Sequence, residues 1–285
     1  FKGRTNYEHG TNQRVGVLLL NLGTPNSPTA KDLKPYLKQF LSDKRVIEVF
    51  RPLWLLILNG IILRTRPKKS AEAYKSIWTD EGSPLLVISK EQRNQVELKL
   101  RERFGDDVTV SLGMRYGTPS VASALKELKE KECSKIVVLP IHCQKTARLV
   151  GEQLGLTRDD FIVSFQSLFG KEEWVKPYTS GTLEYLAKNG TTSVDVICPG
   201  FIADCVETLE EIEDENREVF MEAGGEKFSY IPSLNARNDA IDFFSDLIIE
   251  NSVNWLPITK QRQVSYSAYQ DYEKVSKAQC PFLKK

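Results

Sequence analysis

The sequence lacks the features that mark several protein classes. Its 285 residues include only five cysteines and no Cys-x-x-Cys pair, which argues against a disulfide scaffold and against zinc-finger spacings. Lys and Arg number 39 and Asp and Glu number 38, so the net charge of +1 gives no overall attraction to nucleic acid. No Gly-x-Gly-x-x-Gly fingerprint or phosphate loop occurs, so nucleotide binding has no positive support. The few scattered cysteines indicate free thiols in a reducing compartment, and the 41% of hydrophobic and 27% of charged residues are typical of a globular protein.

Long apolar runs are also missing. The longest is Pro52–Leu63, which is interrupted by Asn59 and Gly60. A membrane-spanning helix needs about 20 apolar residues, so this segment is too short to be one. Four cationic residues follow within Arg64–Lys69. The pattern fits either a core helix with a solvated basic end or a segment that docks on a membrane surface. The residues alone favour the core helix.

The hydrophobic pattern predicts alternating strands and helices. The predicted strands are Val15–Leu20, Val108–Leu112, Lys135–Pro140, Phe161–Gln166, Val194–Cys198 and Phe228–Ile231. The predicted helices are Thr29–Leu41, Ala71–Trp78, Ser89–Phe104, Val121–Lys131, Thr146–Leu154, Thr182–Asn189, Val206–Ala223 and Ala236–Ile249. This alternation predicts an α/β fold with parallel sheets covered by helices on both faces. Ligands of such folds bind at the carboxyl ends of the strands.

Two of the turns at strand ends carry residues suited to a flat anionic ligand. Arg115 and Tyr116 follow the Val108–Leu112 strand, and a fixed cation beside a phenol suits an aromatic anion. Taken alone, a surface arginine and a packed tyrosine are the slightly favoured alternative. Trp174, after the Phe161–Gln166 strand, fits an aromatic pocket wall, although a core tryptophan is the commoner case.

The most specific pattern is acidic. Glu207, Glu211, Asp214 and Glu218 follow the spacing of one face of an α-helix. A row of carboxylates can hold or conduct a hard cation because such cations prefer oxygen ligands. The alternative is a solvated acidic helix start that the helix dipole favours, and composition alone favours it.

Several motifs in order resemble the ferrochelatase family, over roughly residues 14–250. The matching stretches are Leu20–Pro25, Tyr36–Asp43, Gly82–Leu85, Gly113–Gly117, Phe165–Ser167, Glu173–Tyr178, Cys198–Phe201, Asp204–Glu211 and Tyr230–Asn235. The resemblance implies two Rossmann-like domains with a ligand cleft between them, at residues 14–140 and 141–250. The remaining residues would form an N-terminal arm, 1–13, and a C-terminal extension, 251–285.

The resemblance also implies an activity. Ferrochelatases insert Fe2+ into protoporphyrin IX to form protohaem, the last step of haem synthesis. Iron is then a substrate, with Zn2+ as a surrogate, and no cofactor is required. Cys198 and Cys205 fall short of the four thiolates that an iron–sulfur cluster usually needs. The family resemblance implies a cytoplasmic enzyme that touches the membrane through the apolar lip Pro52–Leu63. The net charge of +1, with no basic stripe beyond residues 64–69, argues against a nucleic-acid partner.

Site residues carry over position by position. The residues implied to lie near the porphyrin and its propionates are Tyr74, Ser83, Arg115, Tyr116 and Trp174. Glu207 matches the inner-site acid that faces the macrocycle, which implies a catalytic and metal-binding role. Glu211, with Asp214 and Glu215, matches the family's acidic row, and Glu211 is the second implied metal ligand.

One departure from the family stands out. Between Pro140 and Ile141 this sequence lacks the segment that, in the family, carries the catalytic histidine. His142 matches no catalytic position. A deleted gene copy, an omitted stretch of sequence and a relative that closes the gap differently all fit. Two other functions therefore stay open: a non-catalytic porphyrin- or haem-binding protein that keeps Arg115 and Trp174, and a binding module for an unrelated small molecule.

Overall fold

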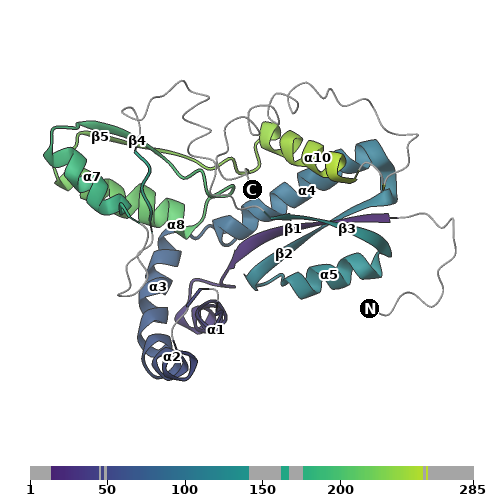
Figure 1. Cartoon of the computed structure of the whole chain (residues 1–285), viewed down its shortest axis with the longest axis horizontal. Helices are drawn as coiled ribbons and strands as arrows, with labels where there is room; N and C mark the ends of the chain where they lie inside the picture. The colour runs from purple at the N-terminus through teal and green to yellow at the C-terminus, as the bar shows by residue number, and fades with distance from the viewer. Residues whose placement is uncertain are drawn as a thin grey trace, which may run out of the picture.

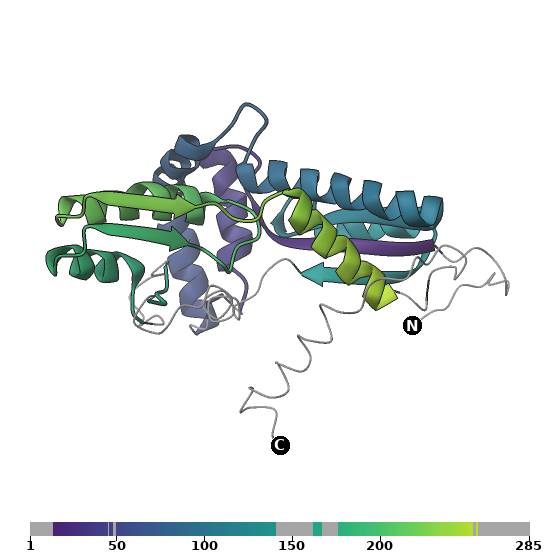
Figure 2. The same ribbon diagram turned by 90° about the horizontal axis from the view of Figure 1, so that it is seen from above.

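The computed structural model describes residues 14–44, 46–47, 50–140, 162–166, 176–252 and 255. Its strands form two parallel sheets, one with the order β2-β1-β3 and one with the order β4-β5. The two sheets lie toward opposite ends of the long axis of the molecule (Figures 1 and 2). The α/β prediction with parallel sheets flanked by helices is confirmed.

The central strand of the larger sheet is β1 (Arg14–Thr24), between β2 (Val108–Gly117) and β3 (Cys133–Pro140). Val17 pairs with Val137 on one side, and the side chain of Leu18 is 2% exposed. Alternate residues of β1 reach opposite faces of the sheet, and both faces are covered. This explains why the strand reads as an uninterrupted apolar run.

In the part of the chain that the structure describes, three helices cover this sheet. The helices α4 (Pro84–Phe104) and α10 (Asn238–Ser252) lie on one face, and α5 (Val121–Glu130) lies on the other (Figure 1). Leu100 and Ile241 are fully buried between α4, α10 and the strands. The end of the described chain thus returns to the sheet with which it begins.

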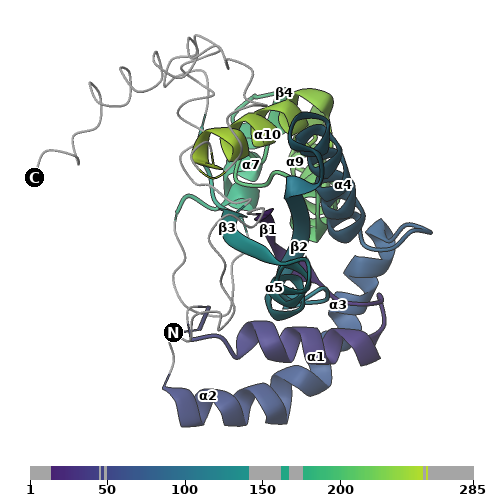
Figure 3. The ribbon, with the colours of Figure 1, turned by 90° about the vertical axis from the view of Figure 1, so that its right-hand side faces the viewer.

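A group of helices extends from the carboxyl end of β1. It comprises α1 (Ala30–Leu41), α2 (Arg51–Ile57), the π-helical η1 (Leu58–Ile62) and α3 (Leu63–Ile77). Thr29 caps α1 by accepting a hydrogen bond from a backbone amide, and α1 and α2 run side by side (Figure 3). Within the described chain, none of the helices combines the length and apolar character needed to cross a bilayer.

The smaller sheet consists of β4 (Ser193–Ile197) and β5 (Lys227–Ile231). The helices α7 (Thr179–Lys188) and α9 (Arg217–Glu222) pack together against it and bury a common apolar cluster. Ile197 is 44% exposed. In the part of the chain that the structure describes, helices therefore cover one face of this sheet rather than both.

Two of the predicted elements need correction. The predicted helix Val206–Ala223 exists as α8 (Val206–Thr208), the π-helical η3 (Leu209–Asn216) and α9, so its middle does not have α-helical geometry. The predicted strand Phe161–Gln166 is wrong: within 162–166 only Phe165 makes a β-bridge, to Tyr178. The predicted helix Thr146–Leu154 lies outside the described residues.

Candidate functional site

Glu207 lies where the two halves of the structure meet. It belongs to α8, which follows the carboxyl end of β4, and its backbone carbonyl accepts a 2.9 Å hydrogen bond from Gln166 Nε2. The preceding residue, Val206, packs against the helices that follow β1. Glu207 is thus attached to one half of the structure and lies close enough to the other for its charge to act on side chains there.

Those side chains include an aromatic cluster. We define the aromatic cluster as five rings linked by edge or stacking contacts: Tyr36, Phe40, Tyr74, Trp78 and Tyr116. Burial is the main cause that raises the pKa of Tyr36, and the charge of Glu207 is the second. The pKa of Tyr74 rises chiefly through burial as well, with Tyr36 and Glu207 contributing. Both phenols therefore stay protonated at neutral pH and act as hydrogen-bond donors rather than bases.

Arg115 lies on β2, and its guanidinium is 5.6 Å from the ring centre of Tyr116 in the aromatic cluster. Its guanidinium is 2.5 Å from Asp43 Oδ2, and the hydroxyl of Tyr116 donates to the same oxygen at 3.0 Å. The hydrogen bond that Arg115 donates to Asp43 is the main cause that raises the pKa of Arg115. The residues around this pair line an open cavity of about 560 Å³: Pro35, Lys38, Gln39, Ser42, Asp43, Arg115 and Tyr116. With a side chain 41% exposed, Arg115 can exchange Asp43 for the carboxylate of a ligand.

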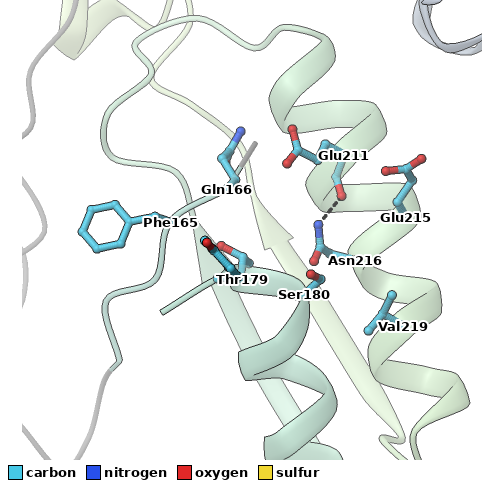
Figure 4. Close-up of a pocket in the computed structure, with 9 residues that line it drawn as sticks. Phe165, Gln166, Thr179, Ser180, Glu211, Glu215, Asn216 and Val219 are labelled. Carbon is cyan, nitrogen blue, oxygen red and sulfur yellow. Dashed lines mark hydrogen bonds between the residues drawn. The ribbon is translucent and has the colours of Figure 1, made fainter. Parts of the chain in front are cut away.

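A second cavity, of about 250 Å³, lies along η3 (Figure 4). Its lining residues are Phe165, Gln166, Tyr178, Thr179, Ser180, Glu211, Glu215, Asn216 and Val219. The acidic residues that line it, Glu211 and Glu215, are four apart in the sequence. Asp214 and Glu218 do not line it. The hydrogen bonds of a π-helix span five residues, so it turns less per residue than an α-helix. The predicted single face of Glu207, Glu211, Asp214 and Glu218 is therefore wrong.

The π-helical turn is supported by a side chain. Asn216, which is 5% exposed, donates from Nδ2 to the backbone carbonyl of Glu211 at 2.5 Å, as Figure 4 shows. Among the described residues, no three acidic, histidine or cysteine side chains converge closely enough to hold a metal ion. The carboxylates of η3 therefore form a negative surface along the cavity instead of a closed coordination site.

Burial and the nearby acids together raise the pKa of Glu210 to about 7. Burial is the main cause, followed by the charges of Glu215 and Glu211. The native protein thus holds a proton on Glu210 that the unfolded chain, with an ordinary value of 4.5, releases more readily. The stabilisation from this proton is complete below pH 4.5 and is lost as the pH rises through about 7.

Glu210→Gln is expected to stabilise the protein above pH 7, because the glutamine removes a charge that burial and its neighbours disfavour. At pH 5 the variant and the unmodified chain should melt at nearly the same temperature, since Glu210 is then protonated. Thermal unfolding followed by circular dichroism at pH 5 and pH 8 measures this difference. Glu222→Gln, at the exposed end of α9, is the control. An equal shift at both pH values would contradict the prediction.

The two described cysteines near Glu207 hold protons. Burial is the main cause that raises the pKa of Cys198 to about 12, with the charge of Asp204 adding to it. Burial and then Glu207 raise the pKa of Cys205 well above its usual range. Both thiols are therefore protonated at neutral pH when no metal is bound.

The remaining predicted site residues have different positions. Ser83 is 2% exposed and accepts a 2.7 Å hydrogen bond from Thr24 Oγ1, so it lies beneath the surface. Trp174 and His142 lie outside the described residues. Tyr36 and Asp43 were not among the predicted site residues, although both belong to the Tyr36–Asp43 stretch that carries the family resemblance.

Comparison with known proteins decides the family. The profile of the family described as Ferrochelatase matches residues 14–144 and 140–252. The chain belongs to the ferrochelatase family. Its relatives include the ferrochelatase of Idiomarina loihiensis, 40% identical over 92% of this chain and 95% of the relative. The ferrochelatases of Hydrogenovibrio crunogenus and Marinobacter nauticus are 42% and 39% identical, each over at least 90% of both chains.

The ferrochelatase alignments also bear on the missing segment. The alignment with the Idiomarina protein has 347 positions, whereas 92% of 285 residues is about 262. About 85 aligned positions therefore have no residue of this chain opposite them. The family profile matches in two segments that meet at 140–144. This junction is where the sequence analysis placed the missing segment.

Proposed function

We propose that this protein inserts ferrous iron into protoporphyrin IX. The observation that carries the proposal is the position of Glu207, which faces the buried phenols of Tyr36 and Tyr74 at the start of the acidic π-helix. A carboxylate there can accept a pyrrole proton and attract a divalent cation. Aromatic side chains nearby suit one face of a macrocycle.

The reaction needs a path for protons as well as for iron. Two pyrrole protons leave as Fe2+ binds, so the metalloporphyrin core is neutral. We propose that Glu207 receives protons and passes them to the acidic residues of η3. Glu210, with a pKa of about 7, both accepts and releases a proton near neutral pH, as such a path requires. The same negative surface, with Glu211 and Glu215 along the cavity, draws the cation toward Glu207.

Arg115 completes the proposed binding mode. We place the porphyrin in the cleft between the two domains that the family fold implies, near Tyr74 and Tyr116, with Ser83 beneath the surface of the cleft and with Trp174 beside the porphyrin only as the family resemblance implies. A propionate of the porphyrin replaces Asp43 as the partner of Arg115, and it gains the bidentate geometry of a guanidinium–carboxylate pair. This exchange leaves the charge at Arg115 balanced before and after binding.

The second candidate is a porphyrin-binding protein without turnover. It is favoured by the about 85 aligned positions at which the chain has no residue, because the family's catalytic histidine belongs to the missing segment. Such a protein would retain Arg115 and the aromatic side chains and would need no base.

One assay separates the two functions. The purified chain is mixed with a soluble porphyrin and ferrous iron or zinc, and the absorbance change of the macrocycle is followed. Turnover supports the proposed chelatase. Porphyrin that quenches tryptophan fluorescence but is not metallated would support the binding protein. Failure to bind any porphyrin would reject both and favour a small-molecule binding module of another kind.

We further propose that α2 and η1 rest on a membrane surface. Their exposed apolar side chains include Leu56, at 73%, and Ile61, at 61%. The cationic residues of Arg64–Lys69 follow on α3 and can meet anionic lipid headgroups. Membrane contact places the protein where an apolar porphyrin is most concentrated.

Leu56→Asp is expected to weaken binding to anionic vesicles by about tenfold, because the apolar contact is replaced by a charge of the same sign as the lipid. Cosedimentation with vesicles of phosphatidylglycerol and phosphatidylcholine measures the effect. Leu98→Asp is a matched control, since Leu98 is 62% exposed on α4, away from α2 and η1. Equal losses in both variants would contradict a specific membrane-binding surface.

A further inference from the structure

A buried carboxylate lies three residues before Glu207. Asp204 is 5% exposed and sits in the loop between β4 and α8. Its Oδ1 atom accepts from the hydroxyl of Tyr230 at 2.7 Å, from the hydroxyl of Thr208 at 3.1 Å and from the amide of Ser233 at 3.2 Å. A buried anion with this many donors is well compensated, and losing them would be costly. Nothing in the proposed chemistry requires this carboxylate to contact iron or porphyrin.

The side chain of Asn235 bonds both the carboxylate and the backbone amide of Asp204. Its Nδ2 atom donates to Asp204 Oδ2 at 2.7 Å, and its Oδ1 atom accepts from the backbone amide of Asp204 at 2.9 Å. The amide of Asn235 donates to the carbonyl of Ile202 at 2.7 Å. Asn235 has a φ of 50°, a left-handed conformation that asparagine tolerates better than most residues. We call the pair Asp204 and Asn235, with these bonds, the Asp204–Asn235 clamp.

The clamp is anchored in the other half of the structure. The carbonyl of Asn235 accepts a 2.8 Å hydrogen bond from Nε2 of Gln92, a fully buried residue of α4. At its other end, Thr208 also accepts a 3.0 Å hydrogen bond from the amide of Cys205 at the start of α8. A continuous set of hydrogen bonds thus runs from α4 to the first turn of the helix that bears Glu207.

From this geometry we infer that Asp204 and Asn235 are positioning residues for Glu207. The kinetic test of this inference rests on the proposed function, whereas its structural test does not. The clamp fixes the first turn of α8 against α4, the helix that packs beside β1, and so it fixes the carboxylate of Glu207 relative to the aromatic cluster. An acid that must meet both a proton and a metal works only within a narrow range of positions.

Two variants release the clamp in different ways. Asp204→Asn keeps the size of the side chain but removes the anion that the donors surround. Asn235→Gly removes both side-chain bonds while relieving the left-handed backbone. Ser245→Ala is the control, because Ser245 is also 5% exposed and bonded, but to the carbonyl of Ile241 within α10.

Hydrogen exchange tests the structural part without any activity. In both clamp variants the amides of residues 205–209 should exchange about tenfold or more faster, whereas Ser245→Ala should leave that segment unchanged. Unchanged exchange in both clamp variants overturns the inference, even if the unmodified chain inserts no metal. If the unmodified chain inserts no metal, that result rejects the proposed function and leaves the structural part of the inference to the exchange data.

Kinetics test the functional part. Asp204→Asn should lower kcat for metal insertion about 10- to 100-fold while changing the KM for porphyrin by less than about threefold. In a Glu207→Asp background, where the carboxylate is already displaced, the same change should have little further effect on kcat. Equal losses of kcat in both backgrounds would mean that Asp204 acts independently of Glu207, and the inference would fail.

Discussion

Glu207→Gln is expected to abolish metal insertion and to leave porphyrin binding nearly unchanged. Glutamine has the size of glutamate, but it carries no charge and accepts no proton at neutral pH. Loss of a positioned acid–base group costs about 10²- to 10⁴-fold in rate. The hydrogen bond from Gln166 goes to the backbone carbonyl of Glu207, so the substitution keeps it. The variant should therefore fold normally and fail only at the chemical step.

Two measurements resolve this prediction. The rate of insertion of Fe2+ or Zn2+ is measured from the absorbance change of the porphyrin. The dissociation constant of the porphyrin is measured from the quenching of tryptophan fluorescence. Glu218→Gln is the matched control, since Glu218 is exposed on α9 and does not line the cavity along η3. A Glu207→Gln protein that still metallates at the unmodified rate would remove Glu207 from the mechanism.

Glu211→Gln separates the two roles assigned to the acidic residues. Because Glu211 lines the cavity away from the aromatic cluster, its loss should raise the KM for the metal more than it lowers kcat. The opposite pattern, with kcat lowered and KM unchanged, would place Glu211 at the reacting atoms instead.

The strands of the larger sheet were predictable because burial on both faces leaves a strong signal. The Val15–Leu20 run lies within β1, and the Val108–Leu112 run lies within β2. Helix α1 was equally clear, since its apolar spacing and its Thr29 cap agree. Local patterns of this kind depend only on residues close in the sequence.

The geometry of the acidic helix could not be predicted in the same way. A helical-face argument assumes a constant turn per residue, and η3 departs from it over Leu209–Asn216. The departure is stabilised by the bond from Asn216 to the carbonyl of Glu211, which has no distinctive sequence signal. As a result the sequence placed Asp214 beside Glu211, whereas the cavity is lined by Glu215.

Long-range pairings were also outside the reach of the sequence. The ion pair of Arg115 with Asp43 joins residues 72 apart in the sequence. Helix α10 packs on α4 although β2, β3, β4 and β5 lie between them in the sequence. An amphipathic pattern shows that a helix has an apolar face, but it does not show which surface covers that face. The family resemblance supplied Arg115 and Glu207 as candidates, and the structure adds the side chains around them.

Gly23→Ala is expected to cause the largest loss of stability, about 3–5 kcal/mol. Gly23 has a φ of +116°, and a Cβ atom built there would lie 1.8 Å from the carbonyl oxygen of Tyr116. That oxygen belongs to the paired backbone of β2, so it cannot move aside as a flexible side chain could. The carbonyl of Gly23 also accepts the hydrogen bond of Tyr36, which ties the damage to the aromatic cluster. Urea unfolding followed by tryptophan fluorescence measures the loss.

Gly190→Ala distinguishes the clash from the backbone strain. Gly190 also has a left-handed φ, of +90°, but a Cβ atom there would have no atom within 4 Å. Its substitution should therefore cost only the conformational penalty of about 1–2 kcal/mol. The excess loss in Gly23→Ala then measures how closely β1 and β2 approach at the end that bears Tyr116. If both variants lost the same stability, the close approach of the two strands would not limit residue 23.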